Sequence, residues 1–176
     1  MSDPSSRALR YLAAHEAVVL EAYRDQVGVW TWGIGITQAA GVDVLAYKDR
    51  PVSVQTCLDA FAALVKRRYW PDVLEAFGSF GLTEAQSAAA LSFHYNTGAI
   101  GTATWVQLVK DGDLKAAEAS MMTWCKPQSL VPRRASECAL FFQQKWPQAM
   151  TLRCLGVKKP GYSPDPNQIR VLDVAL

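Results

Sequence analysis

Apolar residues recur at spacings of three and four along the N-terminal part of the chain. They are Leu9, Leu12, Ala13, Val19, Leu20 and Tyr23. This period predicts one face of an amphipathic helix that runs to about Tyr23. It would begin near residues 3–5, where capping residues flank a proline. Glu16 falls on the same apolar face, where burial disfavours an ionised carboxylate and favours the protonated form.

The period changes after this segment. Residues 30–37 place Trp and Ile at alternate positions, with Thr31, Gly33, Gly35 and Thr37 between them. Alternation with aromatic and β-branched residues predicts a strand that follows a turn around Gly28. Residues 38–50 are ambiguous and allow a second short strand or a loop.

The rest of the chain is dominated by helical patterns. Predicted helices span about residues 53–69, 72–77, 84–96, 104–110, 114–124 and 132–146. The helix at 84–96 is apolar nearly all round, which is typical of a buried central helix. A first helix, a small β-element and then many helices predict an α+β protein that is mainly α.

The pattern changes again at residue 150. A loop rich in Pro and Gly is followed by residues 169–176, which read as one strand or a short helix. We therefore predict one main domain over residues 1–149. Residues 150–176 are expected to form a C-terminal extension packed on the same domain, with a role that the sequence does not reveal.

Composition and charge exclude several classes of function. Half of the 176 residues are hydrophobic and the formal net charge is only +2, without a long basic run, so nothing favours nucleic-acid binding. The long uncharged stretch between Glu84 and Lys110 contains polar residues and glycines, which indicates a buried helix and no stable membrane insertion. The chain has two histidines, and its four cysteines match no zinc spacing, so we expect free thiols, no metal and no cofactor.

A second carboxylate gives Glu16 a possible partner. Asp25 follows the predicted helix in polar surroundings, where it should stay ionised. Glycoside hydrolysis uses two carboxyl groups with such opposed environments, one as proton donor and one acting on the opposite face of the sugar. Thr31 could hold a water near Asp25, and the strand glycines would leave room for a sugar ring. The residues alone also allow Glu16 as a structural partner of an arginine and Asp25 as a turn residue.

The stretch from Glu16 to Gly35 has the form E-x6-Y-x-D-x2-G-x2-T-x-G-x-G. This pattern closely resembles the phage lysozyme (endolysin) family of glycoside hydrolases. Two later segments are similar to the same family, LTEAQSAAALSFHYNTGAIG at 82–101 and LVPRRASECALF at 130–141. The resemblance covers roughly residues 5–146. It implies a lysozyme-like fold, with a small N-terminal β-lobe, a larger helical lobe and a cleft between them.

The resemblance implies a role for each matching residue. Glu16 matches the proton-donating acid, Asp25 the second catalytic carboxylate, and Thr31 the threonine that helps to position water. The residues that match substrate-binding positions are Tyr23, Gly33, Gly35, Asn96, Arg133 and Arg134. For the arginine pair a second reading stays open, an ion pair on the helix surface between Arg133 and Glu137.

The activity that follows from the resemblance is that of a muramidase. It would hydrolyse the β-1,4 bond between N-acetylmuramic acid and N-acetylglucosamine in bacterial peptidoglycan, during host lysis by a phage or prophage. The N-terminus lacks the pattern of a signal peptide, so we expect a monomer that accumulates in the host cytoplasm and needs a holin to reach the wall. Two alternatives remain: a non-catalytic peptidoglycan-binding or scaffold domain of the same fold, and a lytic transglycosylase.

Overall fold

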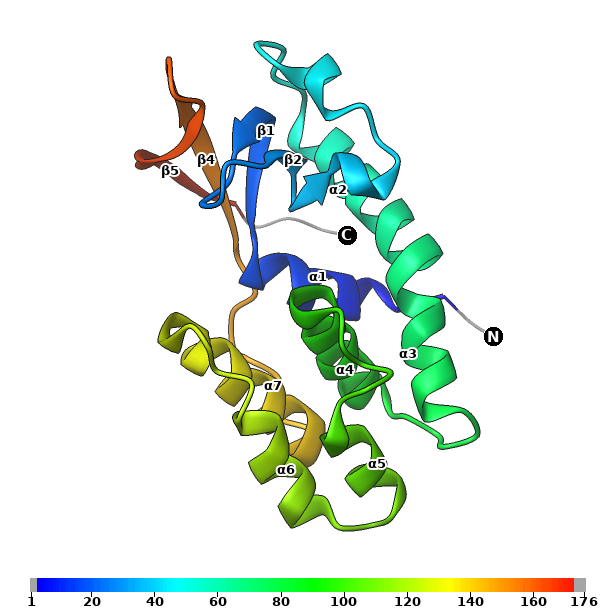
Figure 1. The fold of residues 1–176 in the computed structure, drawn as a ribbon. Helices are drawn as coiled ribbons and strands as arrows, with labels where there is room; N and C mark the ends of the chain where they lie inside the picture. Colours follow the sequence, from blue (N-terminus) through cyan, green and yellow to red (C-terminus); the bar gives the residue numbers. More distant parts are fainter. Residues whose placement is uncertain (1–2, 173–176) are drawn as a thin grey trace. The chain divides into compact units, whose positions relative to one another are not determined.

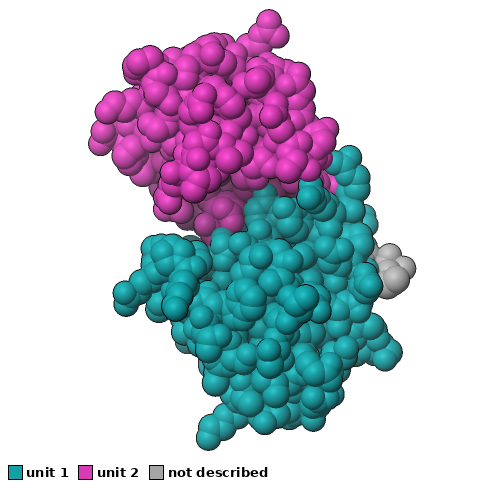
Figure 2. All heavy atoms as spheres, in the orientation of Figure 1, with its two compact units in different colours: residues 1–12, 66–149 teal, residues 13–65, 150–176 magenta. Residues whose placement is uncertain are grey.

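A computed structural model describes residues 3–172 of the chain. These residues form two compact units, coloured separately in Figure 2. Unit 1 comprises residues 1–12 and 66–149, and unit 2 comprises residues 13–65 and 150–176. Helices and a mixed sheet occur together in the chain (Figure 1), so the fold is α+β with about half of the residues helical.

Unit 2 is built around a five-stranded sheet. Its strands are β1 (Ala17–Arg24), β2 (Trp30–Gly33), β3 (Ile36–Thr37), β4 (Leu152–Lys158) and β5 (Ser163–Leu172), in the order β3-β2-β1-β4-β5. The β1–β4 pair is parallel and the other pairs are antiparallel. Residues 169–172 therefore lie in a strand, whereas residues 173–176 of the ambiguous C-terminal segment lie outside the described residues.

The first predicted helix is wrong in its second half. Helix α1 spans Ser6–His15, and the next residues form β1. Val18 and Val19 are fully buried in this strand, which has partners on both sides. A short apolar run that includes β-branched residues fits either period, and the pairing with β2 and β4 decides in favour of the strand. Glu16 consequently lies at the junction of α1 and β1, where it is half-buried, and the prediction that it lies on an apolar helix face is wrong.

The predicted strand over residues 30–37 is interrupted by a tight turn. β2 ends at Gly33 and β3 begins at Ile36, which pairs with Trp32 across the hairpin. Gly33 and Gly35 have φ angles of 63° and 67°, a left-handed conformation that glycine adopts at little cost. Their main role here is therefore to form the turn. The ambiguous region 38–50 contains two short 3₁₀ helices, Gln38–Ala40 and Val44–Tyr47.

The predicted helix over residues 53–69 is shorter than expected. α2 spans Val54–Leu64, and Ser53 caps it by accepting a hydrogen bond from the amide of Thr56. A π-helical turn, Val65–Tyr69, follows and leads into α3 (Trp70–Phe77). Pro71 therefore lies in the first turn of α3, where its missing amide hydrogen costs no helical hydrogen bond. Residues 70 and 71 are part of this helix and do not separate two helices.

Unit 1 holds the remaining helices close to their predicted positions. They are α4 (Glu84–Thr97), α5 (Thr104–Lys110), α6 (Leu114–Met122) and α7 (Val131–Gln143). α4 begins with a capping box, in which Thr83 and Gln86 exchange side-chain to backbone hydrogen bonds. Its middle is buried from Ala88 to His94, which confirms the prediction of a central buried helix.

Candidate active site

Asp25 lies in the turn that joins β1 to β2. Its Oδ1 atom accepts hydrogen bonds from the backbone amides of Val27 and Val29, at 3.0 and 2.9 Å. The backbone closes the same turn, because the amide of Asp25 donates to the carbonyl of Val29 at 3.0 Å. Gly28 adopts a φ of 84° in this turn, a conformation that favours glycine. One carboxylate oxygen is therefore fixed by the backbone, and these bonds leave the other oxygen free to act.

Thr31 and Tyr23 lie directly opposite each other on β2 and β1. Residues paired in this way point to the same face of a sheet, so the two side chains are neighbours. Thr31 is 3% exposed, and its hydroxyl donates to the carbonyl of Val29 at 3.2 Å. Because a hydroxyl both donates and accepts, the oxygen of Thr31 can still accept a hydrogen bond from a water molecule.

Glu16 shares an electrostatic environment with Asp25. Burial raises the pKa of Tyr23 above its ordinary value, and the charges of Glu16 and Asp25 raise this pKa further. Both carboxylates therefore act on the same phenol, which stays protonated at neutral pH and can serve as a hydrogen-bond donor. The amide of Glu16 donates to the carbonyl of Ala13 at 3.1 Å, which holds the residue at the end of α1.

The sequence-predicted site residues divide between the two units. Unit 2 holds Glu16, Tyr23, Asp25, Thr31, Gly33 and Gly35, and unit 1 holds Asn96, Arg133 and Arg134. Within unit 2, Tyr23 pairs directly with Thr31, and Asp25 lies in the turn that follows β1. Glu16 lies just before β1, and its charge, like that of Asp25, raises the pKa of Tyr23. Gly33 is buried and Gly35 is exposed, both in the β2–β3 turn.

In unit 1 the arginine pair converges on a buried carboxylate. Arg133 donates to Glu137 at 3.0 Å, and Arg134 donates to the other oxygen of the same carboxylate. Ser92 on α4 also donates to Glu137, at 2.6 Å. Burial raises the pKa of Glu137, and the two guanidinium groups and the Ser92 hydroxyl oppose this effect. The ion pair between Arg133 and Glu137 is therefore present, but it is buried and does not lie on the helix surface.

Arg134 is 0% exposed, and its other two side-chain nitrogen atoms also donate hydrogen bonds. It donates to the backbone carbonyl of Trp124 at 3.2 Å and to Oδ1 of Asn96 at 2.7 Å. This placement favours a structural role for Arg134, and its assignment to substrate binding stays a prediction that its burial does not support. Sequence reasoning assigned no role to Ser92, although a serine in an apolar helix was a signal that it has a buried partner.

Two further properties concern the described residues only. Within residues 3–172, no group of three or more His, Cys, Asp or Glu side chains is arranged to hold a metal ion. None of the helices in this range has both the length and the apolar character that crossing a membrane requires.

Comparison with known proteins identifies the family and the fold of the chain. The family model described as phage lysozyme matches residues 13–137. The endolysin of Acyrthosiphon pisum secondary endosymbiont phage 1 is 27% identical over an alignment of 149 residues that covers 78% of this chain and 96% of that relative. Among solved structures, a variant of P22 lysozyme has a TM-score of 0.65 at 25% identity, covering 81% of this chain and 99% of that one.

A third protein has a similar fold. The muramidase domain of SpmX from Asticaccaulis excentricus has a TM-score of 0.61 at 24% identity, covering 80% of this chain and 98% of that one. The fold is therefore lysozyme-like. Because the family match covers most of the chain and includes Glu16, Asp25 and Thr31, the chain belongs to the phage lysozyme family and hydrolyses bacterial peptidoglycan.

Proposed function

We propose that Glu16 and Asp25 are the catalytic carboxyl groups of a muramidase that cuts the β-1,4 bond between N-acetylmuramic acid and N-acetylglucosamine. The observation that carries this proposal is the turn after β1, where two backbone amides hold one oxygen of Asp25, two residues beyond Tyr23, which pairs directly with Thr31. Two carboxyl groups around one sugar-binding position are what acid-assisted glycoside hydrolysis requires. The family to which the chain belongs supports the same chemistry.

The two carboxyl groups would have different tasks. Glu16 would protonate the oxygen of the leaving sugar, the role of the residue that it matches in the phage lysozyme family. Asp25 would act on the opposite face of the sugar ring, with one oxygen held by two amides. Thr31 would accept a hydrogen bond from a water molecule beside Asp25 and orient it for attack.

Residues of both units are assigned to substrate contacts. Tyr23 would donate a hydrogen bond to the glycan from its protonated phenol. The exposed backbone at Gly35 would allow a sugar ring to approach closely. In unit 1, half-buried Asn96 is the more accessible candidate, because Arg133 and Arg134 are committed to Glu137.

The biological setting is also proposed. The protein would act as a monomer, accumulate in the cytoplasm of the host and reach the cell wall when a holin permeabilises the membrane. The relative from Acyrthosiphon pisum secondary endosymbiont phage 1 is described as an endolysin, which fits a role in lysis by a phage or prophage.

Clearing of a peptidoglycan suspension tests the proposal. Glu16→Gln and Asp25→Asn remove one ionisable oxygen each and keep the shape of the side chain. We expect both rates to fall by about a hundredfold or more, the usual effect of losing a catalytic acid or base. Asp43→Asn is the matched control, because Asp43 is an exposed carboxylate of the same unit, and it should keep the wild-type rate.

Each alternative has a distinct outcome. A wild-type protein that binds peptidoglycan but releases no product would support a non-catalytic scaffold. An Asp25→Asn variant with full activity beside an inactive Glu16→Gln variant would support a lytic transglycosylase, which needs the acid but no attacking water. Wild-type activity in Glu16→Gln would exclude the assigned acid.

A further inference from the structure

The hairpin of β4 and β5 lies outside the segment that matches the family. The match ends at residue 137, whereas the hairpin spans residues 152–172. It nevertheless joins the strand that leads to Asp25, because Ala17–Val19 of β1 pair in parallel with Arg153–Leu155 of β4. Figure 1 shows β4 beside β1, with β5 at the outer edge. The hairpin is therefore part of the sheet that carries the candidate carboxylates.

The tip of this hairpin, residues 159–162 between β4 and β5, contacts the backbone immediately before Asp25. The amide of Arg24 donates to the carbonyl of Tyr162 at 2.6 Å. Tyr162 adopts a φ of 58°, a left-handed conformation that is unfavourable for a bulky residue and persists only when surrounding contacts impose it.

The first contact is aromatic. The rings of Tyr162 and Trp30 meet edge to face, with centroids 5.3 Å apart and an interplanar angle of 62°. Trp30 pairs with Arg24 across the strands, one position along from the pair of Tyr23 and Thr31. Because side chains alternate between faces, Trp30 and Arg24 lie on the face of the hairpin opposite to the catalytic candidates.

Arg24 continues this contact into the turn. Its guanidinium group lies 4.8 Å from the centre of the Trp30 ring, a cation–π geometry. Its Nη1 atom donates to the carbonyl of Gly28 at 3.2 Å. A continuous series of contacts thus runs from Tyr162 through Trp30 and Arg24 to the turn that fixes the Asp25 carboxylate.

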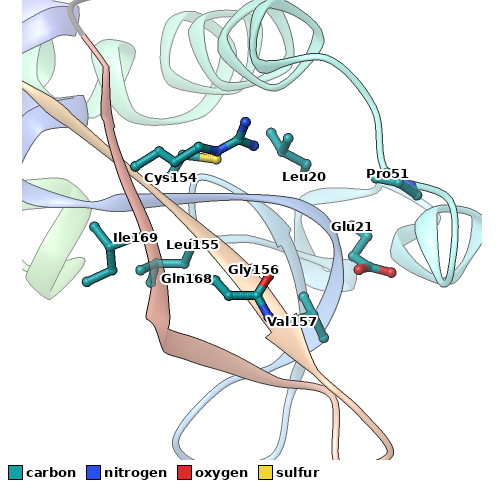
Figure 3. Close-up of a pocket in the computed structure, with 10 residues that line it drawn as sticks. Leu20, Glu21, Pro51, Cys154, Leu155, Gly156, Val157, Gln168 and Ile169 are labelled. Atoms are coloured by element: carbon teal, nitrogen blue, oxygen red, sulfur yellow. The ribbon is translucent and has the colours of Figure 1, made fainter.

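Charged groups attach the tip from the other side. Lys159 lies 2.5 Å from Asp49 and 3.2 Å from Glu21, measured from Nζ to the carboxylate oxygens. The Tyr162 hydroxyl donates to Asp49 at 2.9 Å. Glu21 also lines a pocket of ≈ 410 Å³ beside β4 and β5, shown in Figure 3, and Gly156 and Gln168 line the same pocket. The tip is therefore bound both to the β1–β2 hairpin and to the loop that contains Asp49.

We propose that the tip of the β4–β5 hairpin, through Tyr162, is a positioning element that holds the Asp25 turn in its active geometry from the face opposite the substrate. The proposal rests on the role proposed above for Asp25. Tyr162 acts through Trp30 and Arg24 and does not touch substrate. Small displacements of a catalytic group lower the rate of the chemical step more than they lower substrate binding.

The test compares Tyr162→Ala with wild type in the full chain. We expect kcat on a soluble peptidoglycan oligomer to fall by about tenfold or more, with KM changed by less than about twofold. Hydrogen exchange of the amides in residues 24–31 should become faster. Without the Tyr162 ring, the backbone carbonyl of residue 162 is no longer held in place to accept from the Arg24 amide. Tyr162→Phe keeps the ring on Trp30 and should restore kcat and protection close to wild type.

Val171→Ala is the matched control. Val171 lies in the same hairpin and is 64% exposed, but it pairs with Arg153 at the end remote from the tip. We expect this variant to keep both kcat and the protection of residues 24–31. An equal loss of kcat in Val171→Ala would show a general effect of weakening the hairpin and would overturn the proposal.

Two outcomes separate this proposal from that for Asp25. Full activity of Asp25→Asn would reject the catalytic role of Asp25, while the exchange experiment would still test the contact with Tyr162. Wild-type kcat and wild-type exchange in Tyr162→Ala would overturn the positioning role even if Asp25→Asn is inactive. If Tyr162→Ala does not fold, Lys159→Met removes two ion pairs at the tip, and unchanged kcat and exchange in that variant would overturn the proposal equally.

Discussion

Replacement of Arg134 by methionine should destabilise the protein strongly. Removing one partner of a buried ion pair costs about 3–5 kcal/mol, because the other charge stays buried. Glu137 keeps its bonds from Arg133 at 3.0 Å and from Ser92 at 2.6 Å, so we take the lower end of this range, about 3 kcal/mol. Trp124 and Asn96 also lose a charged donor, which adds about 1 kcal/mol. The expected loss is therefore about 4 kcal/mol.

Urea unfolding followed by circular dichroism measures this loss. Arg153→Met is the control, because Arg153 is exposed on β4, and we expect a change within about 0.5 kcal/mol. A loss below about 1 kcal/mol for Arg134→Met would refute this reasoning.

Two further predictions concern other parts of the structure. Hydrogen bonds from Lys159 and Tyr162 hold the pKa of Asp49 below its ordinary value of 3.8. The stability that these bonds contribute is fully present above pH 3.8 and is lost as the pH falls through the lower pKa of Asp49 in the folded protein. The melting temperature of the wild type should therefore fall more steeply in this pH range than that of Asp49→Asn. Parallel curves of melting temperature against pH for the two proteins would contradict this. Half-buried Cys125 should react with iodoacetamide at about pH 8 before Cys57, because burial raises the pKa of the Cys57 thiol to about 12; equal rates of labelling in the native protein would contradict this.

The helices of unit 1 could be predicted well because their signals are local. Thr83 followed by Gln86 marks the start of α4, and the apolar run that follows marks its burial. β1 could not be predicted in the same way. Its strand conformation depends on pairing with Arg153–Leu155, more than a hundred residues away in the sequence, and no local pattern records such a partner.

The candidate site shows the same contrast. Glu16, Asp25 and Thr31 were assigned from their spacing and from the family resemblance, and these assignments stay predictions; Glu16 does not lie on a buried helix face, as was first expected. Arg134 was matched to a substrate-binding position, and the sequence did not reveal its burial, since arginine is rarely fully buried unless it is paired. Its partners Glu137 and Asn96 come together with it only in the folded unit.

The most direct test of the central claim is mass spectrometry of the products released from purified peptidoglycan. If Glu16 is the acid and Asp25 with Thr31 directs a water molecule, the wild-type protein should release muropeptides with reducing N-acetylmuramic acid ends, and Glu16→Gln should release almost none. Anhydro ends from the wild type, or the same reducing products from Glu16→Gln, would contradict the account.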